Sequence, residues 1–138
     1  QQPPAAVKIP PPPRELDIFR IALANTLARQ DKTNFSEYHD FIRSKATAAE
    51  DEVRATAALA LGEVGTEQDI PVLENILYED GITPAIQAGF GLMALGTESA
   101  FEVIEQFLVQ FADSQYPRDR QVYSIVSSTY EDIKTMQR

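Results

Sequence analysis

The sequence contains no cysteine and only one histidine, His39. The absence of cysteine excludes disulfides, thiolate metal sites and cysteine nucleophiles together. A single histidine excludes metal sites that need several histidine ligands. The sequence also lacks an uninterrupted apolar run near the ~20 residues that a membrane-spanning helix needs, so no segment is expected to cross a bilayer.

Positive charge is missing from the middle of the chain. Residues 55–117 contain no Lys or Arg but ten Asp and Glu, whereas residues 1–54 balance eight basic with eight acidic side chains. An acidic block repels phosphate backbones and anionic membranes and attracts basic protein surfaces. We therefore expect a protein partner with a basic surface, no nucleic-acid partner and no direct membrane insertion. The open alternative is a solvated acidic surface that only keeps the protein soluble.

Six of the nine prolines lie in residues 1–13. Proline fixes φ and lacks a donor, so this segment predicts an extended polyproline tail that serves as a tether or docking strand, or a disordered tail. Residues 14–138 are then one domain. The chain begins at Gln1, not at methionine. This start suggests a processed form, a trimmed form or a fragment, and favours an exported or envelope-associated location.

From residue 14 onward the spacing of apolar residues is helical, which predicts an all-α fold without strands. Leu16, Phe19, Leu23 and Leu27 form one apolar stripe on a first helix, the pattern of a helix that packs against a core. Six more helices are predicted, at residues 35–42, from Asp51 to Gly65, from Ile70 with Pro71 in its first turn, from Thr83-Pro84 to Gly96, at residues 101–111, and after Pro117.

The chain repeats itself at an offset of 31 residues. Residues 55–77 align with residues 86–108, and eight aligned pairs are identical: Ala57/Ala88, Leu61/Leu92, Gly65/Gly96, Thr66/Thr97, Glu67/Glu98, Val72/Val103, Glu74/Glu105 and Leu77/Leu108. In a weaker upstream copy, Phe19-Arg20 and Leu23-Ala24 match Val53-Arg54 and Ala57-Ala58. Three units of about thirty residues, each a helix pair, predict an α-solenoid of about three pairs plus a C-terminal capping helix.

Small residues recur in the first helix of each unit. Ala57, Ala58, Ala60 and Gly62, and later Ala88, Gly89 and Gly91, predict a close approach between neighbouring helices. Gly65 and Gly96 are predicted to end their helices in the left-handed conformation. On the last helix, the seven-residue spacing of Tyr116, Tyr123 and Tyr130 predicts one stripe that caps the open end of the stack.

The segment Val53-Arg54-x-x-Ala57-Ala58-x-Ala60-Leu61-Gly62-x-x-Gly65 resembles the first helix of a HEAT-like repeat, of the short bacterial type also seen in phycobilin lyase subunits. The resemblance covers residues 14–112. The third unit departs from it, with Pro84-Ala85 where the family has Val-Arg. The resemblance implies a curved stack whose second helices line a binding face, and hence a protein-interaction scaffold or accessory subunit.

A mainly acidic set of side chains is expected on these second helices. The candidate binding residues are Glu37, Asp40, Glu67, Glu74, Tyr78, Glu98, Glu102 and Glu105. The alternative is that they are only the outward residues of amphipathic helices. Two other roles stay open: an enzyme-associated module like phycobilin lyase subunits, and a structural spacer in an envelope or secreted assembly.

No catalytic motif accompanies the repeat. The chain has no Gly-rich phosphate loop, no Gly-x-Ser-x-Gly elbow and no calcium-loop spacing. His39 aligns at the 31-residue offset with Ile70 and Phe101, both apolar, which predicts a packed histidine. Asp40 points about 100° away from it on a helix, so the pair forms no ready dyad. We therefore expect no enzyme activity, no cofactor and no metal.

Overall fold

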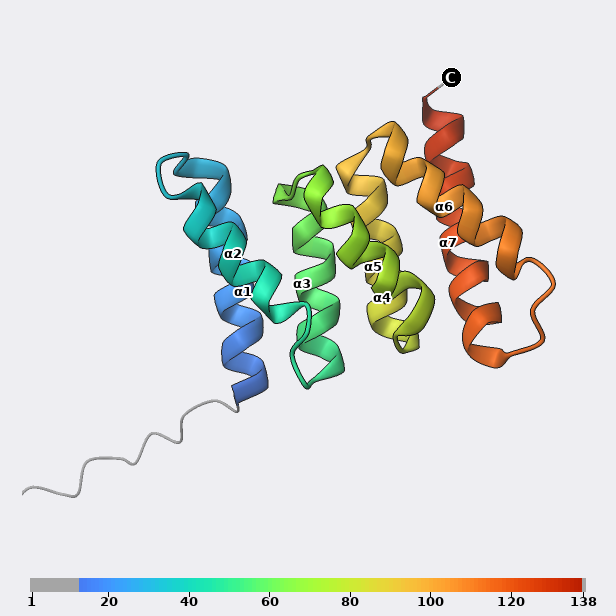
Figure 1. Cartoon of the computed structure of the whole chain (residues 1–138), viewed down its shortest axis with the longest axis horizontal. Helices are drawn as coiled ribbons and strands as arrows, with labels where there is room; N and C mark the ends of the chain where they lie inside the picture. Colours follow the sequence, from blue (N-terminus) through green and yellow to red (C-terminus); the bar gives the residue numbers. More distant parts are fainter. Residues whose placement is uncertain (1–12, 138) are drawn as a thin grey trace, which may run out of the picture.

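The computed structural model describes residues 13–137 (Figure 1). This range contains seven α-helices and one 3-10 helix and no strand, which confirms the all-α prediction. The elements are α1 (Pro13–Gln30), α2 (Phe35–Lys45), α3 (Asp51–Val64), η1 (Glu67–Asp69), α4 (Ile70–Glu79), α5 (Ile82–Leu95), α6 (Glu98–Phe111) and α7 (Pro117–Met136). The predicted proline-rich tail lies outside the described residues except for Pro13, the first residue of α1.

The helices form two layers that run from α1 at one end to α7 at the other (Figure 1). The first layer contains α1, α3, α5 and α7, and the second contains α2, α4 and α6. Neighbours in the first layer pack directly on one another, above all α3 on α5, whereas α2 and α4 hardly touch. This arrangement is a small α-solenoid of three helix pairs with α7 added at the C-terminal end.

Glycine explains why α3 and α5 lie so close together. A Cβ atom on Gly62 would collide with the backbone of Gly91, and one on Gly91 would lie 2.6 Å from the carbonyl oxygen of Ala58. Around this contact Leu61 and Leu92 are fully buried. The close helix approach predicted from the small residues is therefore confirmed, and burial of the leucines offsets the helix-breaking tendency of glycine.

Two predictions about helix ends were wrong. Gly96 ends α5 with φ +70°, as expected, but Gly65 after α3 is extended, with φ −83°. Gly65 is required for space instead, because a Cβ there would collide with the carbonyl oxygen of Leu61. In addition, α5 begins at Ile82, so Thr83 and Pro84 lie inside its first turn. Proline is tolerated there because first-turn N–H groups have no intrahelical acceptor.

The apolar stripe of α1 does not face the core. Phe19 and Leu23 are 64% and 46% exposed, and the buried residues of α1 are Ile21, Ala24 and Ala28. The helix contacts α2 and α3 through the side that carries these buried residues. The stripe points outward because α1 stands at the end of the stack, with no described helix beyond it.

The last helix closes the other end of the stack. Val122, Val126 and Tyr130 of α7 are buried, and α7 packs on α5 and α6. The predicted tyrosine stripe is wrong, because Tyr116 precedes the helix and is 74% exposed whereas Tyr130 is 4% exposed. Burial, with the nearby Glu105 charge as a second cause, raises the pKa of Tyr130 to about 12.

Candidate protein-interaction surface

Two shallow depressions on the second-layer helices lie at equivalent positions of the repeat. One is lined by Pro71, Glu74, Asn75, Tyr78 and Glu79 of α4, and the other by Glu102, Glu105, Gln106, Val109 and Gln110 of α6. Each residue of the first set stands 31 positions before its counterpart in the second. We call these ten residues the second-helix face. The structure thus brings Glu74 together with Tyr78, and Glu102 together with Glu105, as two related surfaces.

Negative charge on this face is not neutralised by neighbouring side chains. Neither α4 nor α6 contains Lys or Arg. Within residues 13–137, Glu74, Glu79, Glu102 and Glu105 make no ion pair. Glu74 is half-buried, whereas Glu79, Glu102 and Glu105 are exposed. Surface carboxylates without a cation partner attract a complementary basic surface at long range.

Tyr78 gives the face an aromatic component. Its ring packs edge-on against Phe107 and Phe111, with centroids 5.5 and 5.6 Å away. Burial raises the pKa of Tyr78, and the charge of Glu74 adds to this effect. A half-buried tyrosine beside a carboxylate is the kind of group that supplies much of the binding energy at protein interfaces.

The other predicted residues lie outside this acidic surface. Glu37 and Asp40 are exposed on α2, but Arg43 stands on that helix at the repeat position of Glu74, so α2 is of mixed charge. Glu67 and Glu98 are exposed first residues of η1 and α6. There a negative charge stabilises the positive end of the helix dipole. The acidic surface is therefore narrower than the predicted set.

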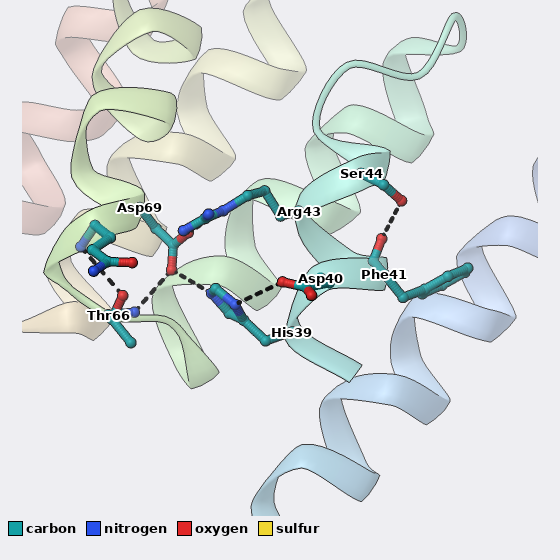
Figure 2. Close-up of polar contacts among 8 residues, drawn as sticks. His39, Asp40, Phe41, Arg43, Ser44, Thr66 and Asp69 are labelled. Carbon is teal, nitrogen blue, oxygen red and sulfur yellow. Dashed lines mark hydrogen bonds and ion pairs between the residues drawn. The ribbon is translucent and has the colours of Figure 1, made fainter. Parts of the chain in front are cut away.

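A buried polar cluster joins α2 to the loop before α4, and sequence reasoning missed it (Figure 2). Asp69 is fully buried, and its Oδ2 lies 2.6 Å from Nε2 of His39. The Nε of Arg43 donates to Oδ1 of Asp69 at 2.9 Å, and the Thr66 amide donates to Oδ2 at 2.8 Å. His39 is 7% exposed and stacks on Phe35, so the prediction of a packed histidine is confirmed.

The donors around Asp69 determine its ionisation. Burial alone raises a carboxyl pKa, but the hydrogen bonds from Thr66, His39 and Arg43 outweigh it and hold the pKa of Asp69 below its ordinary value. Asp40, by contrast, stays 3.9 Å from Nδ1 of His39, beyond hydrogen-bonding distance. The cluster is thus a carboxylate held by fixed donors, which tie two units together.

Within the second unit, an arginine of α3 holds a carboxylate at the end of α4. Arg54 of α3 binds both carboxylate oxygens of Asp80 at 2.8 and 2.9 Å, and this hydrogen bonding holds the pKa of Asp80 low. In the third unit the buried Ala85 replaces this arginine. Arg118 of α7 also donates to the end of α4, at the carbonyl oxygens of Leu77 and Asp80, at 2.6 and 2.8 Å. These contacts fix the end of α4, the helix that carries Glu74.

A groove on the first-layer helices differs from the second-helix face in that its carboxylates are paired with cations. It runs along α1 and α3 and is lined mainly by small and apolar side chains, with Glu52 and Glu63 among them. Arg14 pairs with Glu52 at 3.5 Å and Arg29 with Glu63 at 3.4 Å. The carboxylates of this side therefore have cation partners, whereas those of the second-helix face have none within the described range.

Two kinds of feature are absent from residues 13–137. No group of three or more His, Cys, Asp or Glu side chains is placed to hold a metal ion there. None of the described helices is both long and apolar enough to cross a membrane.

The repeat and its helix pairs have a counterpart among known families. Residues 15–92, more than half of the 138, match the family of HEAT repeats. The chain belongs to the HEAT repeat family. Proteins with these repeats typically mediate protein–protein interactions. The match covers α1 to α4 and most of α5, while α6 and α7 lie beyond it. No curated protein and no solved structure matches the chain.

Proposed function

We propose that this HEAT-repeat protein is a non-catalytic scaffold or accessory subunit that binds a basic protein surface through its second-helix face. The observation that carries the proposal is the pair of equivalent acidic depressions on α4 and α6, in a stretch without Lys or Arg. The contacts at Asp69 and Asp80 hold the two ends of α4 in fixed positions. A rigid face loses little entropy on binding, which favours affinity.

The resemblance to phycobilin lyase subunits suggests a second role, in which the solenoid supports a chromophore-handling enzyme. Such a site needs a groove with several convergent, available polar groups. In the groove along α1 and α3, Glu52 and Glu63 are already paired with arginines. The second-helix face offers several carboxylates without a cation partner within residues 13–137, and these favour the scaffold role. A spacer role would leave this face without a ligand.

The test is affinity capture from the native source with the purified chain, at about 50 and about 300 mM salt, followed by mass spectrometry. The informative variant is Glu74→Lys plus Glu102→Lys, which reverses charge in both depressions. Glu105 is left unchanged because its charge lies near the buried Tyr130. Asp113→Lys plus Asp132→Lys is the matched control, since both aspartates are exposed outside the face.

Each double variant moves the net charge from −9 to −5, because two acids become two bases. We expect one recurrent basic partner that the wild type and the control retain at low salt and the Glu74/Glu102 variant loses. Capture that survives in the Glu74/Glu102 variant, or that is lost equally in both variants, would refute the assignment to this face.

A further inference from the structure

Equivalent residues of the second-helix face form two rows that run across α4 and α6. At the 31-residue offset Glu74 corresponds to Glu105, and Tyr78 corresponds to Val109. In each helix the apolar residue follows the glutamate by four positions, so the two side chains lie about one turn, or about 6 Å, apart on the same side. The glutamates therefore form an acidic row, and Tyr78 and Val109 form an apolar row beside it.

The apolar row is open to a partner. Val109 is 82% exposed and lies in the depression on α6. Tyr78 is half-buried in the equivalent depression on α4, where its ring contacts Phe107 and Phe111. Contact with a partner would remove the Val109 side chain and the remaining surface of the Tyr78 ring from water, which favours association. A partner that carries only positive charge would leave this row unused.

The spacing of the two rows selects the shape of the partner. Packed helices have axes about 8–10 Å apart, and α4 contacts α6, so equivalent side chains on these helices lie about 10 Å apart. An α-helix presents the same side every seven residues, a rise of about 10.5 Å. A β-strand presents one side at every second residue, at about 6.6 or about 13 Å, and so does not match this spacing. The rows lie about 6 Å apart, so one side of an α-helix, about 10 Å wide, covers both.

Resting on the function proposed above, we propose that the partner binds through an amphipathic basic α-helix that lies across α4 and α6. Two basic residues seven positions apart lie opposite Glu74 and Glu105. Two apolar residues, each three positions after a basic one and therefore on the same side of the helix, lie against Tyr78 and Val109. Docking of an amphipathic helix through anchors at these spacings is a recurring mode of protein recognition. The acidic row attracts the helix, and the two rows together fix its register.

The test compares three fluorescent synthetic peptides in anisotropy titrations with the full chain at about 50 mM salt. The first is an alanine-rich helix of about 18 residues with two arginines seven positions apart and a leucine three positions after each. The second has the same composition, but its second arginine and second leucine are moved by two positions, which turns them to the other side of the helix. The third is proline-rich, with arginines three positions apart, a rise of about 9.3 Å in an extended polyproline helix.

We expect the first peptide to bind about fivefold or more tightly than the second or the third. Circular dichroism checks that the first two peptides are equally helical. Val109→Gln should weaken binding of the first peptide about threefold or more, because the apolar row loses its more exposed member. Ile125→Gln is the matched control, since Ile125 is 42% exposed on α7, outside the second-helix face, and the substitution should leave binding unchanged.

Equal binding of the two helical peptides, tighter binding of the proline-rich peptide, or unchanged binding to Val109→Gln would overturn the helical partner. Failure of the proposed function gives a different result: Glu74→Lys plus Glu102→Lys would bind the first peptide as tightly as the wild type, which would refute both proposals. If that variant weakens both helical peptides and the wild type prefers neither, the face binds basic groups without a helical register. The proposed function then stands, and the helical partner is refuted.

Discussion

Asp69 connects two units of the solenoid through one buried carboxylate. Its oxygens accept hydrogen bonds from a backbone amide and from side chains of α2, which is distant in sequence. At the corresponding position of the next unit stands Ala100, which is also buried. The chain therefore uses a polar contact at its first junction where the second has an apolar one. A buried charge that keeps its partners is stabilising relative to any variant that leaves those partners without an acceptor.

Asp69→Asn should lower the free energy of unfolding by about 2–3 kcal/mol at pH 7, because hydrogen bonds to a charged acceptor are replaced by weaker ones. The pKa of Asp69 lies below 3.8 in the folded protein. Its stabilisation is thus present above pH 3.8 and is lost as the pH falls through the folded value. The difference between wild type and variant, measured by urea unfolding from pH 7 to pH 2.5, should shrink below pH 4.

Asp40→Asn is the control for that series, since Asp40 is exposed one residue from His39. It should leave stability within about 0.5 kcal/mol of wild type. A difference between wild type and Asp69→Asn that stays constant from pH 7 to pH 2.5 would contradict the role assigned to the Asp69 carboxylate.

At the scale of elements, the contact between α3 and α5 determines the geometry of the stack. Gly62→Ala places a Cβ against the Gly91 backbone, which cannot rotate away as a side chain would. The helices must separate, and we expect a loss of about 3 kcal/mol in the free energy of unfolding. Gly81→Ala is the matched control, because its Cβ would meet nothing closer than an Asp51 oxygen at 3.4 Å. Chemical denaturation measures the free energy of unfolding of both variants. Equal values for Gly62→Ala and Gly81→Ala would show that the close approach of α3 and α5 does not depend on Gly62.

Amide hydrogen exchange should be slower in α3 and α5 than in α2. The helices α3 and α5 contain most of the fully buried small residues and contact neighbours on several sides, whereas α2 packs mainly on α1 and α3. Amides of α3 and α5 should therefore exchange at least tenfold more slowly than those of α2, because they open only with the whole stack. Mass-spectrometric exchange that protects α2 as well as α3 would show that the first unit is more firmly held than its contacts indicate.

The helices were predictable from sequence because apolar spacing and the 31-residue repeat both record which residues are buried. The orientation of α1 was not predictable. That helix has two apolar sides, and periodicity cannot say whether Ile21 and Ala24 or Phe19 and Leu23 meet a neighbour. The extended Gly65 was missed for a similar reason, since a glycine required for space looks the same in sequence as one required for positive φ.

The candidate site was predictable in part. The lack of Lys and Arg in residues 55–117 located the acidic surface, and the repeat placed Glu74 and Glu105 on equivalent positions. Nothing in the sequence showed that Arg43 and His39 would reach Asp69, because these pairs are 26 and 30 residues apart. Such contacts depend on how consecutive units pack, and this packing is determined only when the whole solenoid folds.

For the whole molecule, the two surfaces have different chemistry and lie on different elements. The second-helix face is acidic and faces outward from α4 and α6, while the α1 stripe is apolar and lies at the N-terminal end of the stack. The partner of the second-helix face therefore needs no contact with the α1 stripe.

The most direct test of the account is the dissociation constant for the captured partner, measured by calorimetry at about 50 and about 300 mM salt. If the second-helix face binds the partner, Glu74→Lys plus Glu102→Lys should weaken binding at least tenfold, a change of about 1.4 kcal/mol. Asp113→Lys plus Asp132→Lys should stay within about twofold of wild type, and binding of the wild type should weaken as salt rises. Equal affinity for the wild type and the Glu74/Glu102 variant would contradict the central claim that the second-helix face binds the partner.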